Sequence, residues 1–198
     1  MANRKKGFTL VELLIVIVVI GVLSAMMMLS STEAVSSAKA ANIINNLRNW
    51  KTAMLEWYAD NIDKVDDKGK VRNKSDTGWT NLADGDSCVQ AMDITKYLNG
   101  EFKASNFVDS SRGANHCVED SSGLTYWIQH FEKDGAFIWC IGCRATLDDT
   151  SSGNKTLLQK LEARAKSTNL LNRDLTPYTS TGGNKHLVWM EVIDFRNN

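Results

Sequence analysis

Residues 7–29 read GFTLVELLIVIVVIGVLSAMMML, and the basic triplet Arg-Lys-Lys at positions 4–6 stands directly before them. Within residues 8–29 the one ionisable side chain is Glu12. A helix over residues 8–29 rises about 33 Å, which is enough to cross a hydrocarbon core of about 30 Å. A carboxylate near the middle of such a helix costs about 2.5–3.5 kcal/mol on insertion, and less near the end, where Glu12 lies. The stretch therefore predicts an apolar helix whose carboxylate needs a partner.

The string KKGFTLVELLIVI at residues 5–17 resembles the class III signal of type IV pilins and pseudopilins, with basic leader, small residue, Phe, Thr, Glu and apolar run at the family's spacing. The resemblance covers about the first 25 residues. It implies that a prepilin peptidase cuts between Gly7 and Phe8 and methylates the new amino terminus at Phe8. It also implies assembly roles for Phe8, Thr9 and Glu12, in which Glu12 of one subunit faces the Phe8 ammonium of a neighbour. Breaking a buried ion pair of this kind costs about 3–5 kcal/mol.

Two other interpretations of the N-terminus are weaker. A secretory signal peptide has an apolar region of about 7–15 residues and a small-residue cleavage site, whereas this run is longer and Glu12 interrupts its start. The other alternative is a signal anchor that stays uncut, with Glu12 at the interface. Many type IV pilins have a proline at the position that Leu29 occupies here, and the helix loosens there on assembly. This chain lacks that proline, so whether its helix melts near Leu29 on assembly is open.

Charge predicts how the chain is placed in a membrane. The sequence has 23 basic and 23 acidic side chains, and loss of the leader, residues 1–7, leaves 20 against 23. This balance does not favour nucleic acid as the main partner. Three basic residues before the apolar run predict an N-in, C-out orientation. We therefore expect a single-pass precursor in the inner membrane, with residues 61–198 outside it.

Export of residues 61–198 from the cytoplasm would place all four cysteines in an oxidising environment. They are Cys88, Cys117, Cys140 and Cys143. An even count in an exported domain favours disulfides, with three possible sets of two bridges. We prefer Cys140 and Cys143 each bonded to one of the other two, because such bridges close long loops. The Cys-Ile-Gly-Cys spacing also occurs in redox and zinc motifs. Here it follows a predicted strand and has no second pair at matching spacing.

The apolar helix is predicted to continue as an amphipathic one, from about Phe8 to about Asn61, because no proline occurs before Pro177. Its length is about 80 Å. Its second half carries an apolar stripe that we expect to pack on a globular domain. The stripe consists of Ile43, Leu47, Trp50, Met54 and Trp57.

The head, residues 61–198, mixes polar loops with apolar segments. Residues 60–87 are charged and read as an irregular αβ-loop; a calcium site near Asp84 and Asp86 is a weaker alternative, since EF-hand spacing is missing. A short helix is predicted over residues 88–98 and a loop over 103–123. Strands are predicted over 125–131, 136–141 and 186–195, with a turn over 132–135, a helix over 156–166 and a loop over 167–186.

These elements predict an α+β fold with a long N-terminal helix, residues 8–60, laid on a three- or four-stranded antiparallel sheet. We expect 8–29 to form the transmembrane segment and filament core. No catalytic constellation, metal site or cofactor motif stands out, so no enzyme is expected.

The leading hypothesis is a homo-oligomeric type IV pilus subunit, secreted into an extracellular filament by machinery in the inner membrane, for adhesion, motility or uptake. A type II secretion pseudopilin is the alternative, and a membrane-anchored receptor is less favoured. Major and minor pilins cannot be separated from the sequence.

Overall fold

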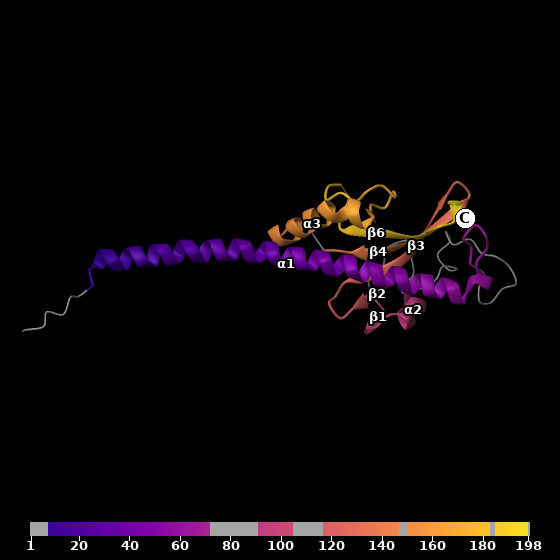
Figure 1. The fold of residues 1–198 in the computed structure, drawn as a ribbon, viewed down its shortest axis with the longest axis horizontal. Helices are drawn as coiled ribbons and strands as arrows, with labels where there is room; N and C mark the ends of the chain where they lie inside the picture. Colours follow the sequence, from indigo (N-terminus) through magenta and orange to yellow (C-terminus); the bar gives the residue numbers. More distant parts are fainter. Residues whose placement is uncertain (1–7, 72–90, 105–116, 147–149, 183–184, 198) are drawn as a thin grey trace, which may run out of the picture.

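One long helix organises the molecule (Figure 1). The computed structural model describes residues 8–71, 91–104, 117–146, 150–182 and 185–197. Helix α1, Leu10–Asp60, has 51 residues and a length of about 75 Å. It runs without interruption past Leu29, so the predicted helix from Phe8 to Asn61 is confirmed. Its first half projects from the head, and its second half lies along the sheet (Figure 1).

The described part of the head contains an antiparallel sheet of six strands in the order β1-β2-β3-β4-β6-β5. The strands are β1 Phe102–Ala104, β2 Cys117–Asp120, β3 Thr125–Lys133, β4 Ala136–Arg144, β5 Leu170–Leu171 and β6 Leu187–Asp194. The α+β class is confirmed. The expected three or four strands are too few, because β1, β2 and β5 lie in segments predicted to be loops.

The turn between β3 and β4 follows the sequence prediction. Asp134 and Gly135 both adopt positive φ angles, 55° and 78°, as a tight Asp-Gly hairpin turn requires. The two strands then pair without a bulge from Lys133 and Ala136 to Thr125 and Arg144. This hairpin forms the centre of the sheet.

The predicted stripe of α1 is the centre of the core. Ile43, Leu47, Trp50, Met54 and Trp57 are all buried, at 8% exposure or less. Trp50 stacks on Tyr126 of β3 at 5.5 Å between ring centroids, and Trp57 packs against Trp139 of β4 at 6.1 Å. The prediction that this half of the helix packs on the head is confirmed.

Helix α3, Ser152–Thr168, covers α1 at the end of the head from which the first half of α1 projects (Figure 1). It confirms the helix predicted over 156–166 and begins four residues earlier, where Ser151 caps it by accepting a hydrogen bond from the Asn154 amide at 3.1 Å. The Ser36 hydroxyl donates to the Gly153 carbonyl at 3.2 Å. Arg164 donates to the Ser37 hydroxyl at 3.0 Å. The head thereby holds α1 from Ser36 onward.

Short elements complete the described chain. They are η1 Ile62–Lys64, α2 Ala91–Ile94, η3 Thr95–Tyr97 and η4 Phe195–Asn197. The helix predicted over 88–98 is thus partly present, as α2 and η3. The candidate calcium ligands Asp84 and Asp86 lie outside the described residues.

The preferred disulfide arrangement is wrong in one of its two bridges. It requires Cys117 to bond Cys140 or Cys143, and no disulfide joins any two of these three buried cysteines. Cys117 of β2 pairs with Trp127 of β3, and Trp127 pairs with Gly142 of β4. Cys140 lies two residues before Gly142, so it is separated from Cys117 by two strand spacings across the sheet and two residues along it. That places their Cα atoms about 12 Å apart, beyond the limit of about 7 Å for a disulfide.

Cys143 faces the opposite side of the sheet. It is buried in the core under α1, whereas Cys117 and Cys140 belong to the cluster on the outer face. Burial raises the pKa of both the Cys140 and Cys143 thiols. Cys88 lies outside the described residues, so a bridge to Cys88 stays a prediction.

Candidate assembly site

The start of α1 is closed by a reciprocal cap between Thr9 and Glu12. The Glu12 amide donates to the Thr9 hydroxyl oxygen at 3.2 Å. The Thr9 amide and the Thr9 hydroxyl donate to Oε2 of Glu12 at 2.8 and 2.9 Å. This is a capping box, which satisfies two amides that a helix N-terminus otherwise leaves without partners.

The cap uses one oxygen of the Glu12 carboxylate and leaves the other available. Both hydrogen bonds from Thr9 end on Oε2. Among the described residues, no donor is assigned to Oε1. The carboxylate is therefore fixed in direction by its own chain while it keeps an acceptor, and its negative charge, for a cation from outside.

The sequence-predicted assembly residues come together here, at the free end of the helix. Phe8 is 83% exposed, and Thr9 and Glu12 follow it within one turn. Gly7, the predicted cleavage residue, lies outside the described residues. The partnership of Glu12 with its own Thr9 was missed from the sequence, although the Thr-x-x-Glu spacing at 9–12 is the signature of a capping box.

Next to this cap lies an apolar surface that no described element of the molecule covers. The large apolar side chains between Leu10 and Met27 are each at least 48% exposed. They are Leu10, Val11, Leu13, Leu14, Ile15, Val16, Ile17, Val18, Val19, Ile20, Val22, Leu23, Met26 and Met27. By length and composition α1 is able to span a membrane. A surface of this size needs either lipid or other protein around it.

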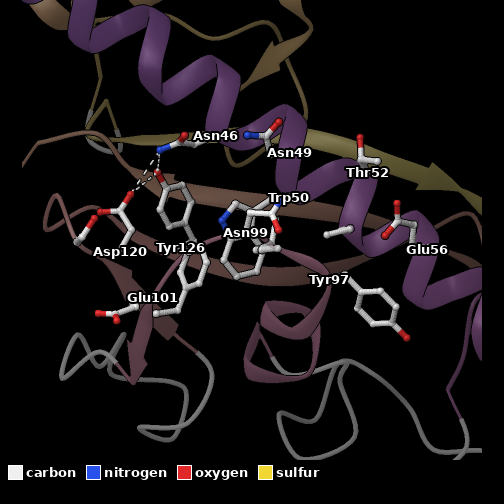
Figure 2. Close-up of a pocket in the computed structure, with 15 residues that line it drawn as sticks. Asn46, Asn49, Trp50, Thr52, Glu56, Tyr97, Asn99, Glu101, Asp120 and Tyr126 are labelled. Carbon is white, nitrogen blue, oxygen red and sulfur yellow. Dashed lines mark hydrogen bonds between the residues drawn. The ribbon is translucent and has the colours of Figure 1, made fainter.

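A second feature is a groove of about 420 Å³ between α1 and strands β1 and β2 (Figure 2). Asn46 donates to the Tyr126 hydroxyl at 2.8 Å, and that hydroxyl donates to Asp120 at 3.1 Å. Burial raises the pKa of Tyr126, so the phenol stays a donor. Glu56 and Glu101 line the same groove.

The N-terminus matches a known family, described as Prokaryotic N-terminal methylation motif, over residues 2–28. The chain is 22% identical to a fimbrial protein of Neisseria meningitidis serogroup A, over 84% of this chain and 89% of the relative. It is 31% identical to the type IV major fimbrial protein FimA of Dichelobacter nodosus, over 43% and 51%. It is 38% identical to fimbrial protein Q of Moraxella bovis, over 26% and 33%. No solved structure matches the chain.

These similarities agree with the geometry. The methylation motif spans the cap and the exposed apolar helix, and the similarity to the Neisseria protein extends through most of the head. The long helix and small antiparallel sheet form the α+β architecture expected of this group. The chain is therefore similar to type IV fimbrial proteins in its N-terminal methylation motif and along most of its length.

Proposed function

We propose that the chain polymerises through the apolar half of α1 into an extracellular type IV pilus. Its similarity to fimbrial proteins supports a structural role and not an enzymatic one. The observation that carries the proposal is the exposed apolar surface from Leu10 to Met27, which the described part of the head leaves uncovered. Lipid covers this surface in the precursor, and the helices of other subunits cover it in the filament.

Cleavage after Gly7 by a prepilin peptidase would create an ammonium at Phe8, beside the apolar surface. In a bundle of such helices that ammonium needs an anion. Oε1 of Glu12 in a neighbouring subunit supplies one, and Thr9 already holds the carboxylate in place. The ion pair sets the register between helices, since a subunit shifted along the bundle would leave both charges buried and unpaired.

The basic leader supports insertion with the N-terminus inside and the head outside the inner membrane. Assembly machinery in that membrane would then extract the subunit into a fibre with the helices inside and the heads outside. Adhesion, motility and uptake are the roles such a fibre can serve.

A pseudopilin of a type II secretion system is the alternative. The same N-terminal signal and long helix serve both kinds of subunit, so the head must separate them. A calcium ion bound at Asp84 and Asp86 would favour the pseudopilin. A receptor that stays anchored is less favoured, because it gives the cleavage signal and Glu12 no role.

The register argument is tested with two substitutions at one position. Glu12→Ala removes the cap and the charge, whereas Glu12→Gln keeps an oxygen for Thr9 and removes the charge. We expect both variants to insert in the membrane and to be cleaved, but to give at least about tenfold less sheared fibre than wild type, since an unpaired buried ammonium costs several kcal/mol. Normal fibre yield from Glu12→Gln would show that the charge is not needed and would contradict the proposed pairing.

A further inference from the structure

The groove between α1 and strands β1 and β2 carries an inference that rests on the proposed filament. We propose that this groove binds the basic helix α3 of a second copy of the chain, as a repeated contact between neighbouring heads. The argument comes from the charges of the two surfaces, from their places on the molecule, and from the lack of charged partners for either among the residues that the structure describes.

The groove is acidic and hollow. It has a volume of about 420 Å³, and no lysine or arginine lines it. Its acidic residues are Glu56, Glu101 and Asp120 (Figure 2). Asp120 is held by its own turn, where it accepts from the Ser122 amide at 2.9 Å. Glu56 and Glu101 are exposed and have no hydrogen bond or ion pair with any described residue, so they are the groups available to an outside cation.

Helix α3 carries the opposite charge. Among its charged residues, four are basic, Lys155, Lys160, Arg164 and Lys166, and one is acidic, Glu162. Arg164 donates a hydrogen bond to the Ser37 hydroxyl, and Glu162 accepts one from Ser180. The three lysines are exposed or half-exposed. The described ion pairs of the head all belong to Arg196, so none of these lysines has an acidic partner in the described residues.

The two surfaces lie on opposite sides of α1 (Figure 1). Helix α3 lies on one side, and β1 and β2 lie on the other. They cannot meet within one rigid head, so they complement each other only between copies. Contact between two different surfaces of identical chains is heterologous, and such a contact repeats into an open helical array when it does not close into a ring.

The positions along α1 give the offset between the copies. Helix α3 touches α1 at Ser36 and Ser37, whereas the groove lies beside Asn46 to Glu56. Ten to twenty residues of helix correspond to about 15–30 Å. A copy whose groove receives the α3 of its neighbour is therefore displaced by about 15–30 Å along the helix axis. This displacement still leaves the 51-residue helices overlapping along most of their length.

Charge reversal with rescue tests the contact. One variant reverses the groove, Glu56→Lys with Glu101→Lys. A second reverses α3, Lys155→Glu, Lys160→Glu and Lys166→Glu. A third combines all five changes in one chain, and Lys133→Glu at the exposed last residue of β3 is the control. Sheared fibre is measured relative to the cleaved subunit in the membrane.

We expect each single-surface variant to lose at least about tenfold in fibre yield, because like charges then face each other. The combined variant regains most of the yield, and the control stays at the wild-type level. Failure of the combined variant to regain yield would mean that the groove binds something other than α3 and would overturn the proposal. Full yield from the groove variant would also overturn it. Absence of fibres from the wild type would instead refute the filament itself.

A cross-link provides a readout that does not depend on yield. A chain with Glu101→Cys and Lys160→Cys should give an oxidised ladder of dimers and higher species within intact fibres, and each single cysteine variant should give none. The native Cys117, Cys140 and Cys143 are buried and do not compete, and Cys88→Ser in every variant removes the fourth cysteine. A fibre in which the double variant gives no ladder would place the two surfaces apart.

Discussion

Gly142 lies in the central strand β4, between two indole rings. It pairs with Trp127 of β3 on one side and with Trp189 of β6 on the other. The two rings meet edge to face, at 84° and 5.0 Å between centroids. A Cβ added at Gly142 would lie 2.4 Å from Cε2 of Trp127 and 2.5 Å from Cζ3 of Trp189. Alanine at this position therefore cannot be accommodated without moving both rings.

The cost of Gly142→Ala follows from this crowding. To restore ordinary contacts, each ring must retreat by about 1 Å, and both are buried, at 5% and 2% exposure. Overpacking of this kind costs about 1–3 kcal/mol. Loss of the edge-to-face pair adds about 0.5–1.5 kcal/mol, and the better backbone entropy of alanine returns about 0.5–1 kcal/mol. We expect a net loss of about 2–3 kcal/mol in the free energy of unfolding.

The assay is urea and thermal unfolding of the soluble head from Ser31 onward, whose core cluster begins at Ala40. For a domain of this size the loss corresponds to a Tm lower by about 4–12 °C. The control is Gly153→Ala in the first turn of α3, where the new Cβ lies at an ordinary 3.9 Å from Thr32. Alanine should leave that site unchanged or more stable. A Gly142→Ala head as stable as wild type would refute the reasoning.

Three further predictions concern titratable groups. Cys140 and Cys143 should resist a thiol reagent at pH 8 in the folded head and react when the head unfolds, because burial raises the pKa of each thiol. Rapid labelling of either thiol in the native head would contradict their burial. Since the unfolded chain ionises them above about pH 8.5, the free energy of unfolding should fall as the pH rises from there, by up to about 1.4 kcal/mol per unit for each thiol. Urea midpoints at pH 8 and 10 measure this, and the fall should be smaller in Cys140→Ala with Cys143→Ala. Hydrogen bonds from Arg196 lower the pKa of Asp194, so Arg196→Met should lower the Tm at pH 7. The effect should be smaller below about pH 4, because the Asp194 carboxyl of the unfolded chain is protonated there. An equal fall in Tm at both pH values would exclude this pair as the cause.

The long helix and its apolar stripe were predictable because local pattern decides them. No proline interrupts residues 8–61, and the spacing from Ile43 to Trp57 is that of one helical face. The β3–β4 hairpin was equally local, since Asp134-Gly135 fixes the turn. In each case neighbouring residues carry the information.

The missed strands and the disulfide error have a non-local cause. β1 and β5 have three and two residues, and β2 has four, so their identity comes from the strands that they pair with. The preferred bridge failed because Cys117 lies two strands away from Cys140 on the same face, whereas Cys143 faces the other side. Cys140 and Cys143 are three residues apart and therefore face opposite sides of the sheet. Loop length in the unfolded chain carries no information about these faces.

The central claim, a cleaved subunit that assembles through its N-terminal helix, is tested most directly by the N-terminal mass of material sheared from cells that express the chain. A pelletable fibre whose subunits begin at methylated Phe8 is the predicted result. An uncut chain beginning at Met1 and retained in the membrane would contradict the account and favour an anchored protein. A chain cleaved at Phe8 but absent from any fibre would contradict polymerisation and favour a pseudopilin or a minor pilin.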